Sequence, residues 1–206
     1  MSEATITCYC GSCELGLAEQ AATCFFQCGC NSCRQKIQFG QAKGGRKFVP
    51  LPKLFYMPSV ITSIKGKKHL QAFQLRENTD STQIYCTKCW AILGVDHVNY
   101  PDSVFLNFPE FCVNNGDLSV PLSAYIMMSD YNEDIGPEPT ESVPLFESLR
   151  YQQERDRLFA LADPQKTFSE PDQPLAGYTF RSLLADLDPP TILNISDSSN
   201  VLTEFK

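Results

Sequence analysis

The sequence has little positive charge and no long apolar run. Its net charge is −7 and its pI is near 4.8, whereas a nucleic-acid-binding surface needs a concentrated basic face. The one basic run, residues 43–47, contains two glycines and is expected to be a solvated loop. No apolar run reaches the roughly 18–20 residues that a membrane-spanning helix needs. We therefore expect neither a nucleic-acid partner nor a membrane span.

A secretory signal and paired histidines are also missing. No basic stretch followed by an apolar one opens the chain, which predicts a cytoplasmic protein with reduced thiols. Clustered cysteines in such a protein indicate metal binding or catalysis more than disulfides. The two histidines, His69 and His97, lack ligand spacing with each other or with any cysteine. Each is expected to be structural, with an acid or base role in a pocket as the alternative.

Cysteine, by contrast, is abundant and clustered. Eight of the ten cysteines lie in the stretches 8–13, 28–33 and 86–89. The first two stretches read C-x-C-x-S-C and the third reads C-x-x-C. Cysteines this close in sequence can direct their sulfur atoms to one metal ion. The other two, Cys24 and Cys112, have apolar neighbours and are predicted to be core residues.

Two partitions of the clustered thiols suit zinc, which favours four ligands in a tetrahedron. In the first partition one zinc is closed by four thiolates, and the second has three thiolates and an open position, as catalytic zinc sites do. The structural ligands would be Cys8, Cys10, Cys86 and Cys89. The catalytic ligands would be Cys28, Cys30 and Cys33. In the second partition Cys13 is an eighth ligand and both sites are closed; spacing alone does not choose between the two.

Residues 1–130 have the pattern of a β domain. Many short strands with closely spaced turns and no helical period between them indicate packed antiparallel sheets. The candidate strands are 4–9, 14–18, 23–27, 60–65, 69–76, 82–85, 91–95, 103–108 and 124–128. Residues 41–47 are expected to form a loop and 114–117 a turn. Prolines at 50, 52 and 58 predict an irregular segment over 49–60, not a central strand.

Residues 131–206 are predicted to form a separate, partly helical arm. This part of the chain begins with an acidic, proline-containing linker at 130–141. Helices are predicted from Pro144 to about Ala162 and over Thr179–Leu187. The Ser/Asp/Asn-rich tail is expected to be partly disordered. The arm is a candidate for a packing element, a lid or a homodimer contact, and the sequence leaves these open.

The order of the cysteine motifs resembles that of the glutathione-dependent formaldehyde-activating enzyme family, which includes centromere protein V-like domains. The matching segments are Thr7–Cys13, Cys28–Arg34 and Ile84–Cys89, and the resemblance covers residues 1–130. It implies a small zinc-bearing β-tent fold with two zinc ions per chain. It also favours the four-plus-three partition, which leaves Cys13 as a spectator. The family usually has Cys-Gly at the last knuckle, but here Trp90 follows Cys89 and is expected to pack over the knuckle.

The resemblance also implies an activity. The family condenses glutathione with formaldehyde and is grouped with the carbon–sulfur lyases, which implies a small-molecule substrate such as glutathione or its adduct at the open zinc. Because the chain is acidic, Arg34, Lys36 or Lys53 would have to attract an anionic substrate. Two alternatives remain. One is a lyase or dehydratase that uses zinc as a Lewis acid on a secondary metabolite, and the other is a non-catalytic, zinc-stabilised interaction module.

Overall fold

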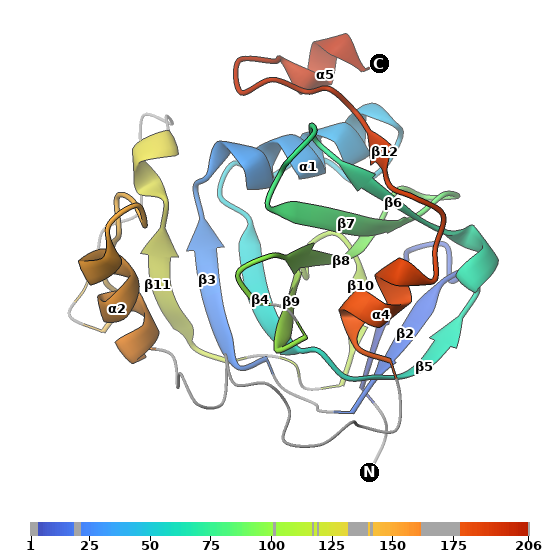
Figure 1. Cartoon of the computed structure of the whole chain (residues 1–206), viewed down its shortest axis with the longest axis horizontal. Helices are drawn as coiled ribbons and strands as arrows, with labels where there is room; N and C mark the ends of the chain where they lie inside the picture. Colours follow the sequence, from blue (N-terminus) through green and yellow to red (C-terminus); the bar gives the residue numbers. More distant parts are fainter. Residues whose placement is uncertain are drawn as a thin grey trace.

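The chain folds into two β-sheets with helices around them (Figure 1). The computed structural model describes residues 4–18, 22–100, 102–116, 118, 120–131, 140, 142–161 and 178–205. The small sheet contains, in order, β10 (Val113–Asn115), β1 (Ala4–Thr7), β2 (Glu14–Leu17) and β5 (Ile61–Lys65). The large sheet contains, in order, β11 (Leu122–Ile126), β3 (Cys24–Cys28), β4 (Lys53–Pro58), β9 (Val104–Asn107), β8 (Ile92–His97), β7 (Ser81–Cys86), β6 (Leu70–Gln74) and β12 (Thr191–Ile192).

The described helices are fewer than the strands. The α-helices are α1 (Asn31–Ala42), α2 (Gln152–Leu161), α4 (Phe180–Ala185) and α5 (Val201–Glu204). Two 3₁₀ turns are η1 (Lys67–His69) and η2 (Met128–Asp130). No helix among the described residues has the length and apolar character that crossing a membrane would take. Because strands in two sheets make up most of the regular structure, the predicted mainly β class is confirmed.

Most strand pairs are antiparallel, as predicted, but two are parallel. β11 runs parallel to β3, and β12 runs parallel to β6. Both parallel partners come from sequence that follows the compact hairpins, so they reach the sheet edges by long connections. The predicted purely antiparallel system therefore needs this correction at its two edges.

The prediction of an irregular segment over 49–60 is wrong. Within this segment, β4 forms and lies inside the large sheet between β3 and β9. Its proline, Pro58, is the last residue of the strand and interrupts no interior hydrogen bond. Leu54 and Tyr56 pack into one core cluster, and Phe55 and Met57 into the other. The strand is therefore buried on both faces, which explains why it lacks a polar alternation.

Helix α1 was not predicted; it lies between the candidate strand 23–27 and the loop expected at 41–47, and it overlaps that loop at its last two residues. The thiol of Cys30 caps its N-terminus by accepting a hydrogen bond from the Cys33 amide. The buried positions Cys33, Ile37 and Gly40 follow helical spacing. Because one is a thiol and one a glycine, the apolar period that would reveal the helix is weak.

The C-terminal arm differs from its prediction in two places. The first predicted helix starts late, at Gln152, because residues before it run beside β11, where the Tyr125 amide donates to the Pro144 carbonyl at 3.0 Å. The second is confirmed as α4 with Thr179 as its cap. The tail is ordered instead of disordered: it forms β12 and α5, and Ile195 and Val201 are buried. Most of the predicted acidic linker lies outside the described residues.

The two faces of the large sheet carry separate cores. One face packs against the small sheet and α4, where Phe180 stacks on Phe105 with ring centroids 4.6 Å apart. The other face packs under α1 and the C-terminal tail, with Ile37 of α1 against the sheet. This separation matters because the cysteine clusters lie on different faces.

Candidate metal centres

The first cysteine group joins the small sheet to the large one. Cys8 and Cys10 follow β1, Cys86 ends β7, and Cys89 lies in the turn that follows. Their four sulfur atoms all lie within 4.8 Å of one another, with Cys8 to Cys10 at 3.5 Å and Cys10 to Cys86 at 3.7 Å. A tetrahedral ion with metal–sulfur bonds near 2.3 Å needs sulfur atoms about 3.8 Å apart. The group therefore fits a closed four-thiolate metal site.

Backbone turns hold these thiols in place. The Cys13 amide donates to the Cys8 sulfur at 3.2 Å, and the Gly11 amide donates to the Cys8 carbonyl at 2.9 Å. Gly11 has φ +67°, a left-handed conformation that glycine adopts without strain. Hydrogen bonding from Ser12 lowers the pKa of Cys10 to about 6. Such amide and hydroxyl donors favour thiolates and orient metal ligands.

Cys13 lies next to this group without belonging to it. Its buried thiol donates to the Gly66 carbonyl at 3.7 Å, and burial raises its pKa. Its sulfur is not among the four that converge. The geometry thus groups the thiols as four plus three.

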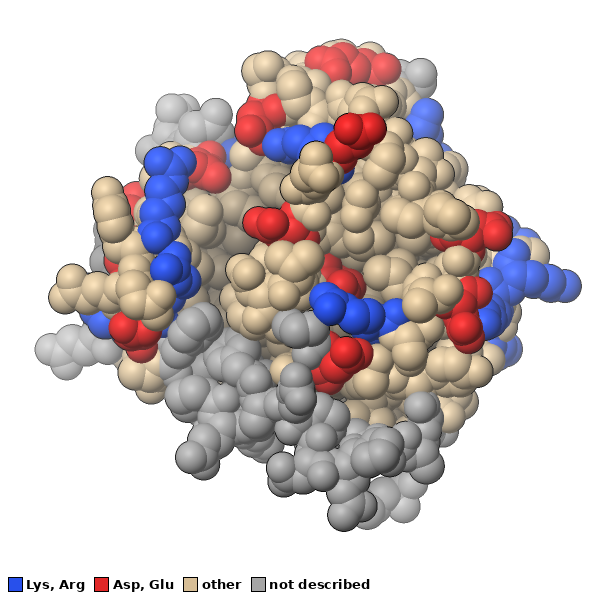
Figure 2. All heavy atoms as spheres, in the orientation of Figure 1, with Lys and Arg blue, Asp and Glu red and all other residues tan. Residues whose placement is uncertain are grey.

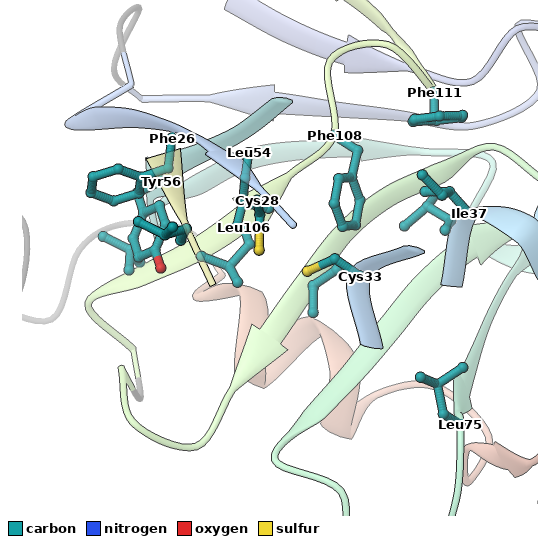
Figure 3. Close-up of a cluster of buried hydrophobic side chains, with 14 of the residues drawn as sticks. Phe26, Cys28, Cys33, Ile37, Leu54, Tyr56, Leu75, Leu106, Phe108 and Phe111 are labelled. Atoms are coloured by element: carbon teal, nitrogen blue, oxygen red, sulfur yellow. The ribbon is translucent and has the colours of Figure 1, made fainter. Parts of the chain in front are cut away.

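The second cysteine group lies on the opposite face of the large sheet, where β3 passes into α1. Cys28 ends β3, Cys30 caps α1 and Cys33 is in its first turn; their sulfur atoms lie within 4.8 Å of one another. Figure 3 shows the Cys28 and Cys33 thiols pointing toward each other beside Phe108. No fourth cysteine, histidine or carboxylate joins them among the residues the structure describes. Three protein donors leave a tetrahedral ion one position for another ligand.

The interactions among these three thiols are unequal. Hydrogen bonds from the Cys28 and Cys30 thiols lower the pKa of Cys33, and the Lys36 ammonium lowers it further. The pKa of Cys28 is raised, first because its proton is shared with Cys30. Cys33 is therefore the thiol of this cluster whose ionised form is favoured, and a thiolate suits the cluster to bind a cation.

Apolar side chains surround the three-thiol group on the sheet side. Leu54, Leu106 and Phe108 lie near the sulfur atoms, and Ile37 of α1 lies beyond Phe108, toward Phe111 (Figure 3). Below α1 and beside α2, the molecular surface is hollowed (Figure 2). Of the three thiols, Cys28 and Cys33 are buried and Cys30 is partly exposed, so the group is not fully enclosed by protein.

His97, at the end of β8, supplies a polar group near the thiols. Its pKa is lowered by burial and then by Lys36, so the ring is neutral at pH 7. Its Nδ1 accepts a hydrogen bond from the Asn99 amide at 3.2 Å. The proton of the neutral ring consequently resides on Nε2, which can donate to a ligand.

Two tyrosines continue from His97 along the sheet. The His97 and Tyr100 ring centroids are 5.4 Å apart, and those of Tyr100 and Tyr56 are 5.6 Å apart. Burial raises the pKa of Tyr56, and a hydrogen bond with Tyr100 raises it further. Both phenols therefore stay protonated at neutral pH and can act as hydrogen-bond donors. Sequence reasoning did not single out Tyr100, because only the fold brings its turn to β4.

Trp90 does not pack over the four-thiol knuckle as predicted. Its ring stacks on Tyr85, with centroids 5.0 Å apart and planes at 13°, and meets the edge of Phe39 of α1. The backbone of Trp90 has φ +59°, which a glycine would adopt without strain. The knuckle therefore keeps the turn that glycine favours, and the tryptophan ring packs on the α1 side.

The remaining candidate residues have structural surroundings. Cys24 and Cys112 are buried core thiols, as predicted. His69 belongs to the short turn η1, and its carbonyl accepts from the Thr87 amide. Arg34 donates to the Asp130 carbonyl at 3.1 Å, and Lys53 is exposed. Of the three basic candidates, Lys36 alone is buried.

Comparison with known proteins adds no relative. No protein-family model matches the chain, and a search of curated proteins found no significant match. The functional argument therefore rests on the arrangement of the side chains.

Proposed function

We propose that this chain is a zinc enzyme that acts at a carbon–sulfur bond of a small thiol adduct, with glutathione adducts as the first substrates to test. The observation that carries the proposal is the three-thiol group. Its sulfur atoms converge without a fourth protein donor among the described residues, and one of the three thiols, Cys30, is only partly buried. A binding module stabilised by metal would not need an incomplete donor set.

Zinc is the metal that this donor chemistry favours. Four thiolates in a tetrahedral cluster are typical of a structural zinc site, and three with an open position are typical of a catalytic one. Cys8, Cys10, Cys86 and Cys89 would hold the structural ion. Cys28, Cys30 and Cys33 would hold the catalytic ion, giving two per chain. When bound there, zinc supplies a Lewis acid that stabilises a sulfur anion at neutral pH.

The chain's own side chains would bind and orient the substrate. The Nε2–H of His97 would donate a hydrogen bond to a substrate oxygen, since Nδ1 is already occupied by the Asn99 amide. Leu106 and Phe108 would shield the sulfur atoms from water. The Tyr56 hydroxyl is committed to Tyr100, so this pair would hold the pocket wall in place.

The test has two parts. First, the visible spectrum of cobalt-substituted protein is recorded while glutathione is added; a saturable shift is expected from an open thiolate site. Second, glutathione adducts of small aldehydes are incubated with zinc-loaded protein, and the released thiol is measured. Turnover by the wild type and its loss in Cys30→Ser would support the proposal. A spectrum insensitive to thiols, together with no turnover of any adduct, would overturn it.

A further inference from the structure

A buried cation lies beside the candidate three-thiol site. Lys36 is on α1, three residues beyond Cys33, and residues three apart on a helix share a face. Lys36 is 3% exposed, although lysine is rarely buried without a partner. Its electrostatic interactions are with Cys30, Cys33 and His97. Within the described part of the chain its side chain forms no ion pair with a carboxylate.

Within the described part of the chain, the groups that can become anionic and that interact with this ammonium are the thiols of Cys30 and Cys33. A buried ammonium without a nearby anion is strongly unfavourable. His97 carries no negative charge in either protonation state, so it cannot compensate Lys36. Among the described residues, the countercharge can therefore come from the thiolates of Cys30 and Cys33, and an anionic ligand bound beside them would add to it.

The charge balance of an occupied site shows what Lys36 changes. Three thiolates around a divalent ion carry a net charge of −1, and an anionic fourth ligand makes it −2. The ammonium of Lys36 brings that total back to −1. A neutral fourth ligand adds no charge, so it gains no comparable Coulomb energy from the lysine. The lysine therefore favours one class of ligand over the other.

We propose that Lys36 makes the open position of the three-thiol site selective for an anionic ligand, such as a thiolate, over a neutral one. This inference rests on the proposed function, because it requires an open metal site on Cys28, Cys30 and Cys33. It narrows the substrate class to compounds that present an anion to the metal. Lys36 acts here through charge and is a specificity-determining residue.

The test compares an anionic and a neutral probe on the full-length, cobalt-substituted chain. Azide and imidazole are titrated separately, and their dissociation constants are read from the visible spectrum. In Lys36→Met, which keeps the unbranched stem but removes the charge, azide binding should weaken at least about tenfold while imidazole binding changes less than about threefold. Lys36→Arg keeps the charge and should bind azide within about threefold of the wild type.

The controls separate a charge effect from damage to the fold. Lys47→Met removes an exposed lysine from the loop after α1 and should leave both constants unchanged. Equal weakening of both probes in Lys36→Met, or no weakening of either, would overturn the inference while leaving the open site established. A wild-type spectrum that responds to neither probe would overturn the proposed function as well. Lys36→Gln provides a second uncharged variant, judged by the same outcomes, if Lys36→Met does not fold.

Discussion

The sulfur atoms of Cys10 and Cys86 lie 3.7 Å apart, although 76 positions separate the two residues in the chain. One follows the first strand of the small sheet and the other ends a strand of the large sheet. The two sheets otherwise meet through apolar side chains such as Ile6 and Ile84. The four-thiol group is thus positioned to act as a cross-link between the sheets.

Loss of one thiol from this group should destabilise the whole fold. In Cys86→Ser the ion would lose a ligand, and the remaining thiolates would lose their compensating charge. A loss of about 4 kcal/mol would lower the melting temperature by about 10 °C in a chain of this size. Differential scanning calorimetry checks this, with Cys112→Ala as a buried thiol outside both groups. A Cys86→Ser protein that keeps two zinc ions and melts with the wild type would rule out the four-plus-three grouping.

The three-thiol group should tolerate a similar change without unfolding. Cys30→Ser removes a metal ligand but installs a good helix-capping residue where the Cys30 sulfur now accepts from the Cys33 amide. We expect bound zinc to fall from two ions to one, and because serine keeps the cap, the helix end should contribute less than about 1 kcal/mol of change in the free energy of unfolding. Metal analysis and chemical denaturation measure both. The matched control, Cys24→Ala on β3, should keep both ions.

At Trp90, a glycine substitution should destabilise the protein less than an alanine substitution does. Because its φ is +59°, alanine would be strained there and glycine would not. Both substitutions lose the stacking on Tyr85. We therefore expect Trp90→Gly to be more stable than Trp90→Ala by about 1 kcal/mol, the cost of a left-handed conformation. Urea denaturation of the two variants decides the order, and the reverse order would mean that the turn at Trp90 differs.

The C-terminal tail should stabilise α1 through Arg76. Its guanidinium donates to the Ile195 carbonyl at 2.9 Å and to Oε1 of Gln35 at 3.0 Å, while Nε2 of Gln35 donates to the Ser196 carbonyl at 2.7 Å. Arg76→Leu leaves these acceptors without a donor and should cost about 2–3 kcal/mol. Hydrogen exchange of α1 amides should accelerate in this variant but not in Arg150→Leu, whose side chain is exposed. Unchanged protection in Arg76→Leu would show that the tail does not support the helix.

The sequence was informative where local pattern determines structure. Close cysteine spacing predicted that neighbouring thiols converge, since C-x-C and C-x-x-C turns bring their sulfur atoms together by short-range geometry, whereas the four-plus-three grouping was favoured only by the family resemblance. The same reasoning failed for β4, because proline was weighed without knowing that Pro58 ends the strand. It failed for α1 because Cys33 and Gly40 carry part of its buried face.

Long-range placement was beyond such patterns. The approach of His97 to Lys36 depends on the register that sets Ser81 opposite His97 and on the packing of α1 over that face. Neither is encoded in the residues adjacent to His97. The ordered conformation of the C-terminal tail likewise depends on Arg76, which lies 119 positions from its hydrogen-bond partner Ile195. Such contacts follow from the completed topology.

The two cysteine groups also differ in how much chain must be assembled before they exist. The three-thiol group is contained in residues 28–33, so forming it closes only a very short loop. The four-thiol group needs residues 8 and 89 to meet, and the entropy cost of loop closure rises with the length of chain enclosed. Contacts of this separation form late in folding. Metal uptake by the four-thiol group should consequently report completion of the fold, whereas the three-thiol group can acquire its ion while the chain is still being synthesised.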